Sequence, residues 1–281
     1  MLFNLNRDPS FKGWTKPGPI VGANVEVPDE ESLDAISGFY RIFQLKQGHR
    51  FSTDDLLTAW YGTTWCPRAA RVLDLGSGLG SVGMIAAWRL PGAQFVTVEA
   101  QEDSVRLARK SAVFNELTER YEIRIGDFRD QQVLAETEKF DLVLGSPPYF
   151  PLGTGVESDH PQKIACRFEV RGNIADYCFT ASRQLAPGGL FVGVFPVEPL
   201  QNARVIAGAE SAGLMIVRRR VVVFREGEPP LLSLFAMMRR TDLPESMRGK
   251  TWDEPPLTIR TRTGEVHPEY SAIKLAIGFP P

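Results

Sequence analysis

The sequence predicts an α/β protein with a seven-stranded, mostly parallel sheet, helices on both faces and an antiparallel hairpin at its carboxyl-terminal end. From residue 71 onward, short β-branched or apolar runs alternate with helical patterns, which is typical of successive βαβ units. The chain has 281 residues and is 43% hydrophobic, enough to bury one large core. Near its end, two apolar runs flank the turn-rich segment REGEPP, which predicts the hairpin.

The amino-terminal part is expected to differ from the rest. Residues 1–36 are rich in Gly, Pro and acidic side chains with little apolar periodicity, so we expect a loosely ordered extension. The domain itself is expected over residues 37–281. Its first part, 37–65, is predicted to be a strand-helix element: the run YRIFQ alternates like a strand, and Ser52-Thr53-Asp54 offers an N-cap before the periodic run LLTAWYG.

The alternating region can be assigned element by element. The expected parallel strands are residues 71–75, 94–99, 121–125, 140–146 and 189–195. The expected helices lie near residues 81–89, 103–115, 173–185 and 200–212. Residues 213–281 are expected to complete the domain as the sheet-edge hairpin, formed by 215–224 and 231–239, and a tail.

Composition narrows the function classes. The three cysteines are widely spaced without a CxxC pair, so we expect neither a disulfide framework nor a metal site. No apolar run approaches the roughly eighteen residues of a membrane span and the start lacks a signal sequence, so we expect a cytoplasmic protein. The net charge of −2 argues against broad, non-specific nucleic-acid binding, although Arg218, Arg219 and Arg220 form either a solvated face or a phosphate-contacting patch.

A glycine-rich turn marks the expected cofactor site. Asp74 lies near the end of the strand 71–75, and Gly76, Ser77, Gly78 and Gly80 follow before a helix, so that a ligand can lie against the main chain. A dinucleotide site favours the spacing G-x-G-x-x-G. The spacing D-x-G-x-G-x-G found here resembles instead the S-adenosylmethionine motif of class I methyltransferases, which have a Rossmann-like fold.

Two further strand ends supply candidate cofactor ligands. Glu99, followed by Ala100, ends the second strand, where a carboxylate can accept hydrogen bonds from both ribose hydroxyls. Asp127 and Phe128 follow the third strand. The resemblance implies that these two residues take the amino group and the ring face of the cofactor's adenine.

The candidate catalytic loop is Ser146-Pro147-Pro148-Tyr149, directly after the fourth strand, at the edge where open α/β sheets place active sites. It resembles the N/D/S-P-P-Y/F/W motif of amino-methyltransferases. An exocyclic amine on a base is a poor nucleophile, and hydrogen bonds to the Ser146 hydroxyl and the Pro147 carbonyl would aim its lone pair at the methyl group. Tyr149 would stack on the base, and Ser146 would also border the cofactor.

Flanking segments extend the resemblance over roughly residues 32 to 275. The sequence resembles bacterial tRNA1(Val) adenine amino (N6)-methyltransferases in the segment LDAISGFYRIFQLKQGHRFSTDDLLTAWYG, in CRFEVRGNIADYC and in the tail PPLTIRTRTGEVHPEYSAI. The resemblance implies that Phe51, Ser52, Thr53 and Asp54 cover the methionine end of S-adenosylmethionine, and that the substrate is tRNA, at the adenine beside the anticodon. The sequence departs from the family at Ser146, which replaces Asn, and at Phe168, which replaces His.

Residues around the loop are candidates for substrate binding. Tyr149, Phe150, Lys163, Arg167 and Arg171 flank the predicted pocket and would hold a splayed nucleotide by stacking and phosphate contacts. Residues 150–165 have the glycine content and length of a flap over the substrate.

Other functions remain open. Serine at position 146 also occurs in DNA cytosine amino-methyltransferases, so another RNA or DNA base is a possible target. A protein glutamine amide presents a similar hydrogen-bonding pattern, although the short, Gly/Pro-rich start does not resemble a substrate domain. A fold retained only for binding RNA is disfavoured by the complete cofactor motif. The oligomeric state is unresolved from sequence, with a monomer favoured.

Overall fold

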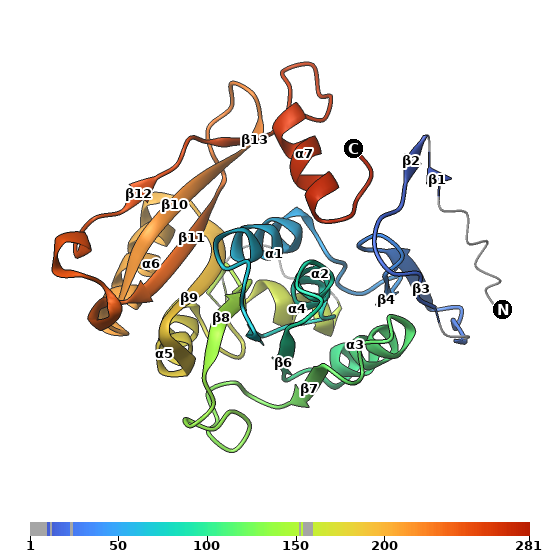
Figure 1. Ribbon diagram of the computed structural model, residues 1–281, viewed down its shortest axis with the longest axis horizontal. Helices are drawn as coiled ribbons and strands as arrows, with labels where there is room; N and C mark the ends of the chain where they lie inside the picture. Colours follow the sequence, from blue (N-terminus) through green and yellow to red (C-terminus); the bar gives the residue numbers. More distant parts are fainter. Residues whose placement is uncertain (1–9, 12, 23–24, 152, 154–159) are drawn as a thin grey trace.

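The computed structural model describes residues 10–11, 13–22, 25–151, 153 and 160–281. Their centre is a nine-stranded sheet in the order β12-β10-β11-β9-β8-β5-β6-β7, with β13 also paired to β10 (Figure 1). Its strands are β5 (Arg71–Leu75), β6 (Gln94–Glu99), β7 (Tyr121–Ile125), β8 (Phe140–Gly145), β9 (Leu185–Pro196), β10 (Leu214–Arg225), β11 (Leu232–Arg239), β12 (Trp252–Asp253) and β13 (Leu257–Arg260). The five strands from β7 to β9 are parallel, and β11 runs antiparallel to both β9 and β10, which confirms the predicted α/β fold and hairpin. The sheet has two short strands, β12 and β13, beyond the seven predicted.

Helices cover both faces of the sheet because neighbouring strand residues point to opposite sides. Val72 of β5 belongs to the core that contains residues of α1, α2 and α3, whereas Leu73 belongs to the core that contains residues of α5 and α6. The helices are α1 (Thr53–Trp65), α2 (Ser81–Arg89), α3 (Glu102–Phe114), α4 (Pro161–Arg167), α5 (Ile174–Gln184), α6 (Pro199–Ser211) and α7 (Pro268–Ala276), with 3-10 turns at Arg240–Asp242 and Glu245–Met247. Among the residues that the structure describes, no helix combines the length and apolar character that a membrane span requires.

The amino-terminal region contains more regular structure than predicted. Short strands β1 (Ser10–Phe11) and β2 (Trp14–Thr15) pair, and β3 (Glu31–Ala35) forms an antiparallel ribbon with β4 (Arg41–Leu45). Within the extension predicted over 1–36, the described residues thus include the paired strand β3, and residues 1–9, 12 and 23–24 lie outside the described structure. The buried carboxylate of Glu31 forms ion pairs with Arg106 and Lys110 of α3, so distant residues stabilise this strand.

The carboxyl-terminal segment is fastened to β10 by the arginine cluster. Arg218 lies 3.6 Å from Glu254, Arg219 lies 2.6 Å from Asp253, and Arg220 pairs with Glu269 of α7. The Arg218 guanidinium also stacks 3.4 Å from the centre of the Trp65 ring. These arginines are engaged in ion pairs within the chain, which argues against a role as a phosphate-binding patch.

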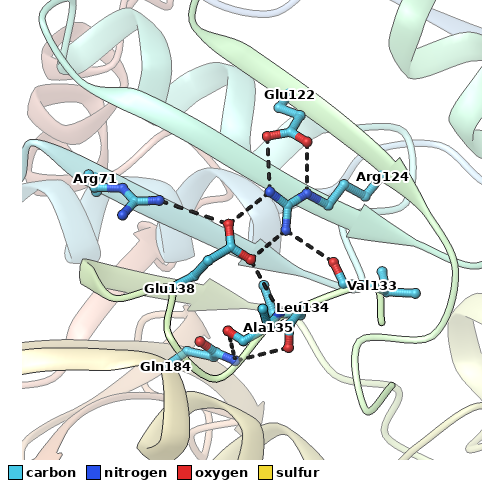
Figure 2. A network of polar contacts seen from close by, with 8 residues as sticks. All are labelled: Arg71, Glu122, Arg124, Val133, Leu134, Ala135, Glu138 and Gln184. Atoms are coloured by element: carbon cyan, nitrogen blue, oxygen red, sulfur yellow. Dashed lines mark hydrogen bonds and ion pairs between the residues drawn. The ribbon is translucent and has the colours of Figure 1, made fainter. Parts of the chain in front are cut away.

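A second ion-pair network braces the loop between β7 and β8 (Figure 2). The Arg124 guanidinium of β7 donates to both carboxylate oxygens of Glu138 at 2.7 and 2.8 Å and to the Val133 carbonyl at 3.0 Å. It also contacts Glu122 at 2.8 Å. The Gln184 amide of α5 donates to two carbonyls of the same loop. The loop that begins with Asp127 and Phe128 is thus fixed to the sheet.

We expect Glu138→Gln to lower the free energy of unfolding by about 1–3 kcal/mol, because it removes a two-pronged, partly buried ion pair from this loop. The matched control is Glu122→Gln, which removes a carboxylate from the same guanidinium at a more exposed position: the Glu122 side chain is 58% exposed and that of Glu138 is 22% exposed. The control substitution is expected to lower the free energy of unfolding by less than about 1 kcal/mol. Urea denaturation measures both, and equal losses would contradict the assigned role of Glu138.

Candidate active site

One cavity lies at the carboxyl ends of the parallel strands, where Leu75 is in register with Val98 and Gly145. Its volume is about 360 Å³. The predicted site residues that line it are Ser52, Asp54, Asp74, Gly76, Ser77, Gly78, Glu99, Ala100, Asp127, Phe128, Ser146, Pro147, Pro148, Tyr149, Phe150, Arg167 and Arg171. The candidate cofactor and catalytic segments, which are far apart in sequence, therefore meet in a single cavity.

The glycine turn between β5 and α2 leaves space for a ligand. Gly76 and Gly78 have φ values of +59° and +55°, which residues other than glycine rarely adopt. A Cβ atom at Gly78 would meet no heavy atom within 4 Å, so the main chain is open at this residue, whereas Tyr177 covers Gly76. The Ser77 hydroxyl is buried and has no hydrogen-bond partner among the described residues. An open main chain beside an unsatisfied hydroxyl fits a bound polar ligand.

Asp74 and Glu99 shape this end of the cavity in different ways. The buried Asp74 carboxylate accepts from the Gly83 amide at 2.9 Å and so fixes the first turn of α2. Glu99 accepts from the Gly78 amide at 2.8 Å with one oxygen and from the Gln101 amide at 2.7 Å with the other. Burial raises the pKa of Glu99 above its usual value. The Glu99 carboxylate, which also bonds the Ala100 amide, lines the cavity, where it can accept hydrogen bonds from ribose hydroxyls.

Asp127 and Phe128 border the next part of the cavity. Hydrogen bonds from the Arg129 guanidinium lower the pKa of Asp127, which keeps its carboxylate ionised. The Phe128 ring packs edge-on against Tyr177, with ring centres 4.6 Å apart. Gly172 borders the same ring, since a Cβ atom there would lie 3.3 Å from Phe128. An acceptor beside an aromatic wall fits an adenine ring with its amino group.

The loop after β8 is held at several points. The Tyr149 hydroxyl donates to Asp54 at 2.5 Å, and its ring packs edge-on against Phe195 at 5.5 Å between centres. The Tyr149 carbonyl accepts from the Gln201 amide at 3.2 Å. Burial raises the pKa of Tyr149 well above its usual value, so the phenol stays protonated. Tyr149, which ends the Ser146-Pro147-Pro148-Tyr149 segment, is therefore held by contacts within the protein.

Phe150 and Arg167 form one rim of the cavity. The Phe150 amide donates to the Arg167 carbonyl at 3.2 Å, and the Arg167 guanidinium lies 6.0 Å from the Phe150 ring centre. These contacts connect Phe150, the first residue of the segment expected to act as a flap (residues 150–165), to Arg167, which lies just after that segment. Residues 152 and 154–159 of that segment lie outside the described part of the chain.

Four predicted site residues do not line the cavity. Phe51 packs toward Phe279, with ring centres 6.4 Å apart, and Thr53 is hydrogen-bonded to Tyr270. Gly80 is the N-cap of α2 and has φ of +84°, so it serves the turn itself. Lys163 lies on α4, and its positive charge adds to the effect of burial in lowering the pKa of His49.

Sequence reasoning also missed residues that line the cavity, chiefly His49, Asp55, Gln101, Cys166 and Tyr177. Asp55 had a local signal, because Ser52 and an acid three residues later form a capping box. It accepts from the Ser52 amide at 3.1 Å and the Ser81 hydroxyl at 3.0 Å. His49, Cys166 and Tyr177 lie within segments that carry the family resemblance, but no chemical pattern there marks them as site residues. They and Gln101 reach the cavity only through the fold.

Asp55 is expected to make stability depend on pH. Burial raises its pKa from 3.8 to about 6, so the folded state disfavours its ionisation. Its contribution to stability is complete below pH 3.8 and is lost as the pH rises through about 6. We expect Asp55→Asn, measured against wild type by urea denaturation, to gain roughly 3 kcal/mol in relative stability between pH 4 and pH 8. Parallel pH profiles for the two proteins would refute this assignment.

Comparisons with known proteins agree with this geometry. Residues 55–165 match the family model of the methyltransferase small domain. A relative from Bacteroides fragilis, named tRNA1(Val) (adenine(37)-N6)-methyltransferase, is 26% identical over 198 residues, covering 70% of this chain and 80% of the relative. A relative of the same name from Tolumonas auensis is 27% identical over 237 residues, covering 83% and 92%.

Structural comparison supports the same fold. A crystal structure from Agrobacterium tumefaciens, described as a predicted O-methyltransferase, superposes with a TM-score of 0.61 at 21% identity, covering 81% of this chain and 98% of that one. The family match runs from within α1 to within α4, and this stretch contains the glycine turn, Glu99 and the Ser-Pro-Pro-Tyr loop. Residues 55–165 therefore match a methyltransferase domain, and the chain is a methyltransferase that uses S-adenosylmethionine.

Proposed function

We propose that this enzyme methylates the exocyclic amino nitrogen of an adenine in tRNA, beside the anticodon. The observation that carries the proposal is the position of Ser146, Pro147 and Tyr149, which line the same cavity as Glu99 and Gly78. Acceptors for an amine and a ring for stacking are thereby close to the residues that fit S-adenosylmethionine. The relatives support the choice of base and RNA, because their name specifies adenine 37 of tRNA1(Val).

The proposed chemistry depends on the protein's acceptors. Bound S-adenosylmethionine supplies a methyl group on a positively charged sulfur. The Ser146 hydroxyl and the Pro147 carbonyl accept hydrogen bonds from the amine hydrogens, so the nitrogen lone pair points out of the base plane toward that methyl. The nitrogen–carbon bond forms as the carbon–sulfur bond breaks, and the methylated nitrogen then releases a proton. Tyr149 keeps the base in line by stacking.

Charge at the rim of the cavity supports a nucleic-acid substrate. Arg167 and Arg171 are exposed there and are available for phosphate contacts, and Phe150 offers an aromatic face that is 37% exposed. By contrast, Arg218 to Arg220 are engaged with the carboxyl-terminal segment. A flipped base from a single-stranded loop suits this arrangement, since an unstacked base can enter a pocket at low cost. A tRNA substrate also implies action in the cytoplasm.

The test supplies methyl-labelled S-adenosylmethionine with, separately, tRNA, duplex DNA and protein extract, all from cells that lack this gene. Labelled material is digested, and the modified nucleosides or amino acids are identified by mass spectrometry. Tyr149→Ala serves as the inactive control. N6-methyladenosine in tRNA that is absent with the control is the expected result, and sequencing of the labelled tRNA then locates the position.

Other products would overturn the substrate assignment. Methylcytosine in DNA would indicate that Ser146 marks a cytosine enzyme, and methylglutamine in protein would indicate that the loop receives an amide. Either product would leave the cofactor assignment intact. Absence of label in all three, with S-adenosylmethionine still bound, would refute the proposed acceptor class.

A further inference from the structure

A hydrogen bond connects the catalytic loop to the first turn of α1. The Tyr149 hydroxyl lies 2.5 Å from Asp54 Oδ2, and the two residues are 95 positions apart in sequence. Both line the cavity. Asp54 is the second residue of α1, and its carbonyl accepts from the Thr58 hydroxyl at 2.8 Å, so its main chain is fixed within the helix.

Two adjacent carboxylates at this helix start have different partners. Asp55 caps the helix through Ser52 and contacts Ser81 of α2. Asp54 takes no part in the capping box: its carboxylate bonds its own main-chain amide and the Tyr149 hydroxyl. Burial raises the pKa of Asp54, and its contact with a phenol that stays protonated offsets part of the cost of burying its charge. The capping function therefore does not explain the side chain of Asp54.

The Tyr149 side chain has few remaining degrees of freedom. Gln201 of α6 holds its carbonyl, the Phe195 ring restricts one edge of its ring, and Asp54 holds the hydroxyl at the far end. Among the described residues, the Tyr149 hydroxyl is bonded by Asp54 and by Ser146 of the same loop. Without Asp54, only Ser146 would hold it. A ring that must stack on a base gains from being fixed beforehand, since a displacement of about 1 Å can reduce a rate roughly 100-fold.

We propose that Asp54 is a positioning residue for methyl transfer, fixing the orientation of the Tyr149 ring through their hydrogen bond. This inference rests on the proposed function, in which Tyr149 stacks on the acceptor base. It differs from the role that the sequence resemblance implies, in which Asp54 covers the methionine end of the cofactor. The two roles make opposite predictions for cofactor affinity.

The experiment compares Asp54→Ala, Asp54→Asn, Tyr149→Phe and the double variant Asp54→Ala/Tyr149→Phe in the full-length protein. The matched control is Asp103→Ala, which removes an exposed acid from the second position of another helix, α3. S-adenosylmethionine affinity is measured by titration calorimetry without acceptor, and kcat and KM are measured on tRNA. Thermal unfolding verifies that each variant folds, and Tyr149→Phe tests the same bond if Asp54→Ala does not fold.

We expect Asp54→Ala and Tyr149→Phe each to lower kcat about 10- to 100-fold, and the double variant to lose no more than either single one. Asp54→Asn retains an oxygen that accepts from the phenol and should recover most of kcat. Cofactor affinity should stay within about threefold in every variant, and Asp103→Ala should match wild type.

Three results would overturn the inference. They are a tenfold or greater loss of cofactor affinity in Asp54→Ala but not in Tyr149→Phe, additive losses in the double variant, and no recovery with Asp54→Asn. Failure of the proposed function is separate, because it appears as a wild-type enzyme that methylates another acceptor. In that case the same variants are compared on that acceptor, and the affinity measurements stand unchanged.

Discussion

Replacing Glu99 by alanine is expected to weaken S-adenosylmethionine binding at least 100-fold. The substitution removes both acceptors proposed for the ribose hydroxyls and also leaves the amides of Gly78 and Gln101 without their partner. The loss of two hydrogen bonds to a charged group, together with a loosened glycine turn, is expected to reduce the binding free energy by about 3 kcal/mol. This corresponds to roughly two orders of magnitude in affinity.

Titration calorimetry with S-adenosylmethionine and its demethylated product measures this loss. Glu99→Gln retains one acceptor of the same shape and should lie between wild type and Glu99→Ala. The matched control is Glu102→Ala, an exposed acid three residues further along in the first turn of α3. An affinity for Glu99→Ala within twofold of wild type would show that other groups hold the ribose.

Ser146→Ala is expected to lower kcat about 100-fold while changing cofactor affinity far less. The hydroxyl is one of two proposed acceptors for the amine hydrogens, and loss of one such group in an enclosed site costs about 10²- to 10³-fold in kcat. Ser146→Asn replaces the hydroxyl with an amide oxygen and should retain most of the activity.

Single-turnover rates on tRNA, with cofactor in saturating amounts, isolate this effect from binding. Tyr149 must stay in place for the comparison, so the Ser146 variants are also examined for unchanged thermal unfolding. Full activity of Ser146→Ala would indicate that the Pro147 carbonyl alone orients the amine. Increased activity on cytosine in Ser146→Ala would place base selection at this residue.

The sequence predicted the elements whose stabilising contacts are local or follow a regular pattern. The helix expected near 81–89 corresponds to α2, and strand 71–75 corresponds to β5. β3 was missed because its residues, ESLDA, alternate poorly, and the strand depends on ion pairs from Glu31 to α3. Helix α4 was missed because its seven residues are too few to show a period, and its Gln162 is fixed by a hydrogen bond to Ser104 of α3.

Within the site, the sequence predicted residues that occupy strand ends, because the carboxyl ends of parallel strands meet at one edge. Glu99 and the Ser146 loop are examples. Residues from helices, such as Tyr177 of α5, entered the cavity without prediction because their position depends on how α5 packs under Gly145. The partner of Tyr149 was likewise invisible, since nothing in the sequence connects position 149 to position 54.

The carboxyl-terminal segment also has a consequence for behaviour at high concentration. Strand β10 is twelve residues long, and an uncovered edge of that length would be a template for joining sheets of different molecules. β12 pairs with it at Arg218 and Arg219, and β13 pairs with it from Val222 to Arg225. These covering strands have two and four residues, so neither presents a long edge of its own. Because the ion pairs of Arg218, Arg219 and Arg220 hold this segment on β10, we expect them to limit aggregation through the edge of the sheet.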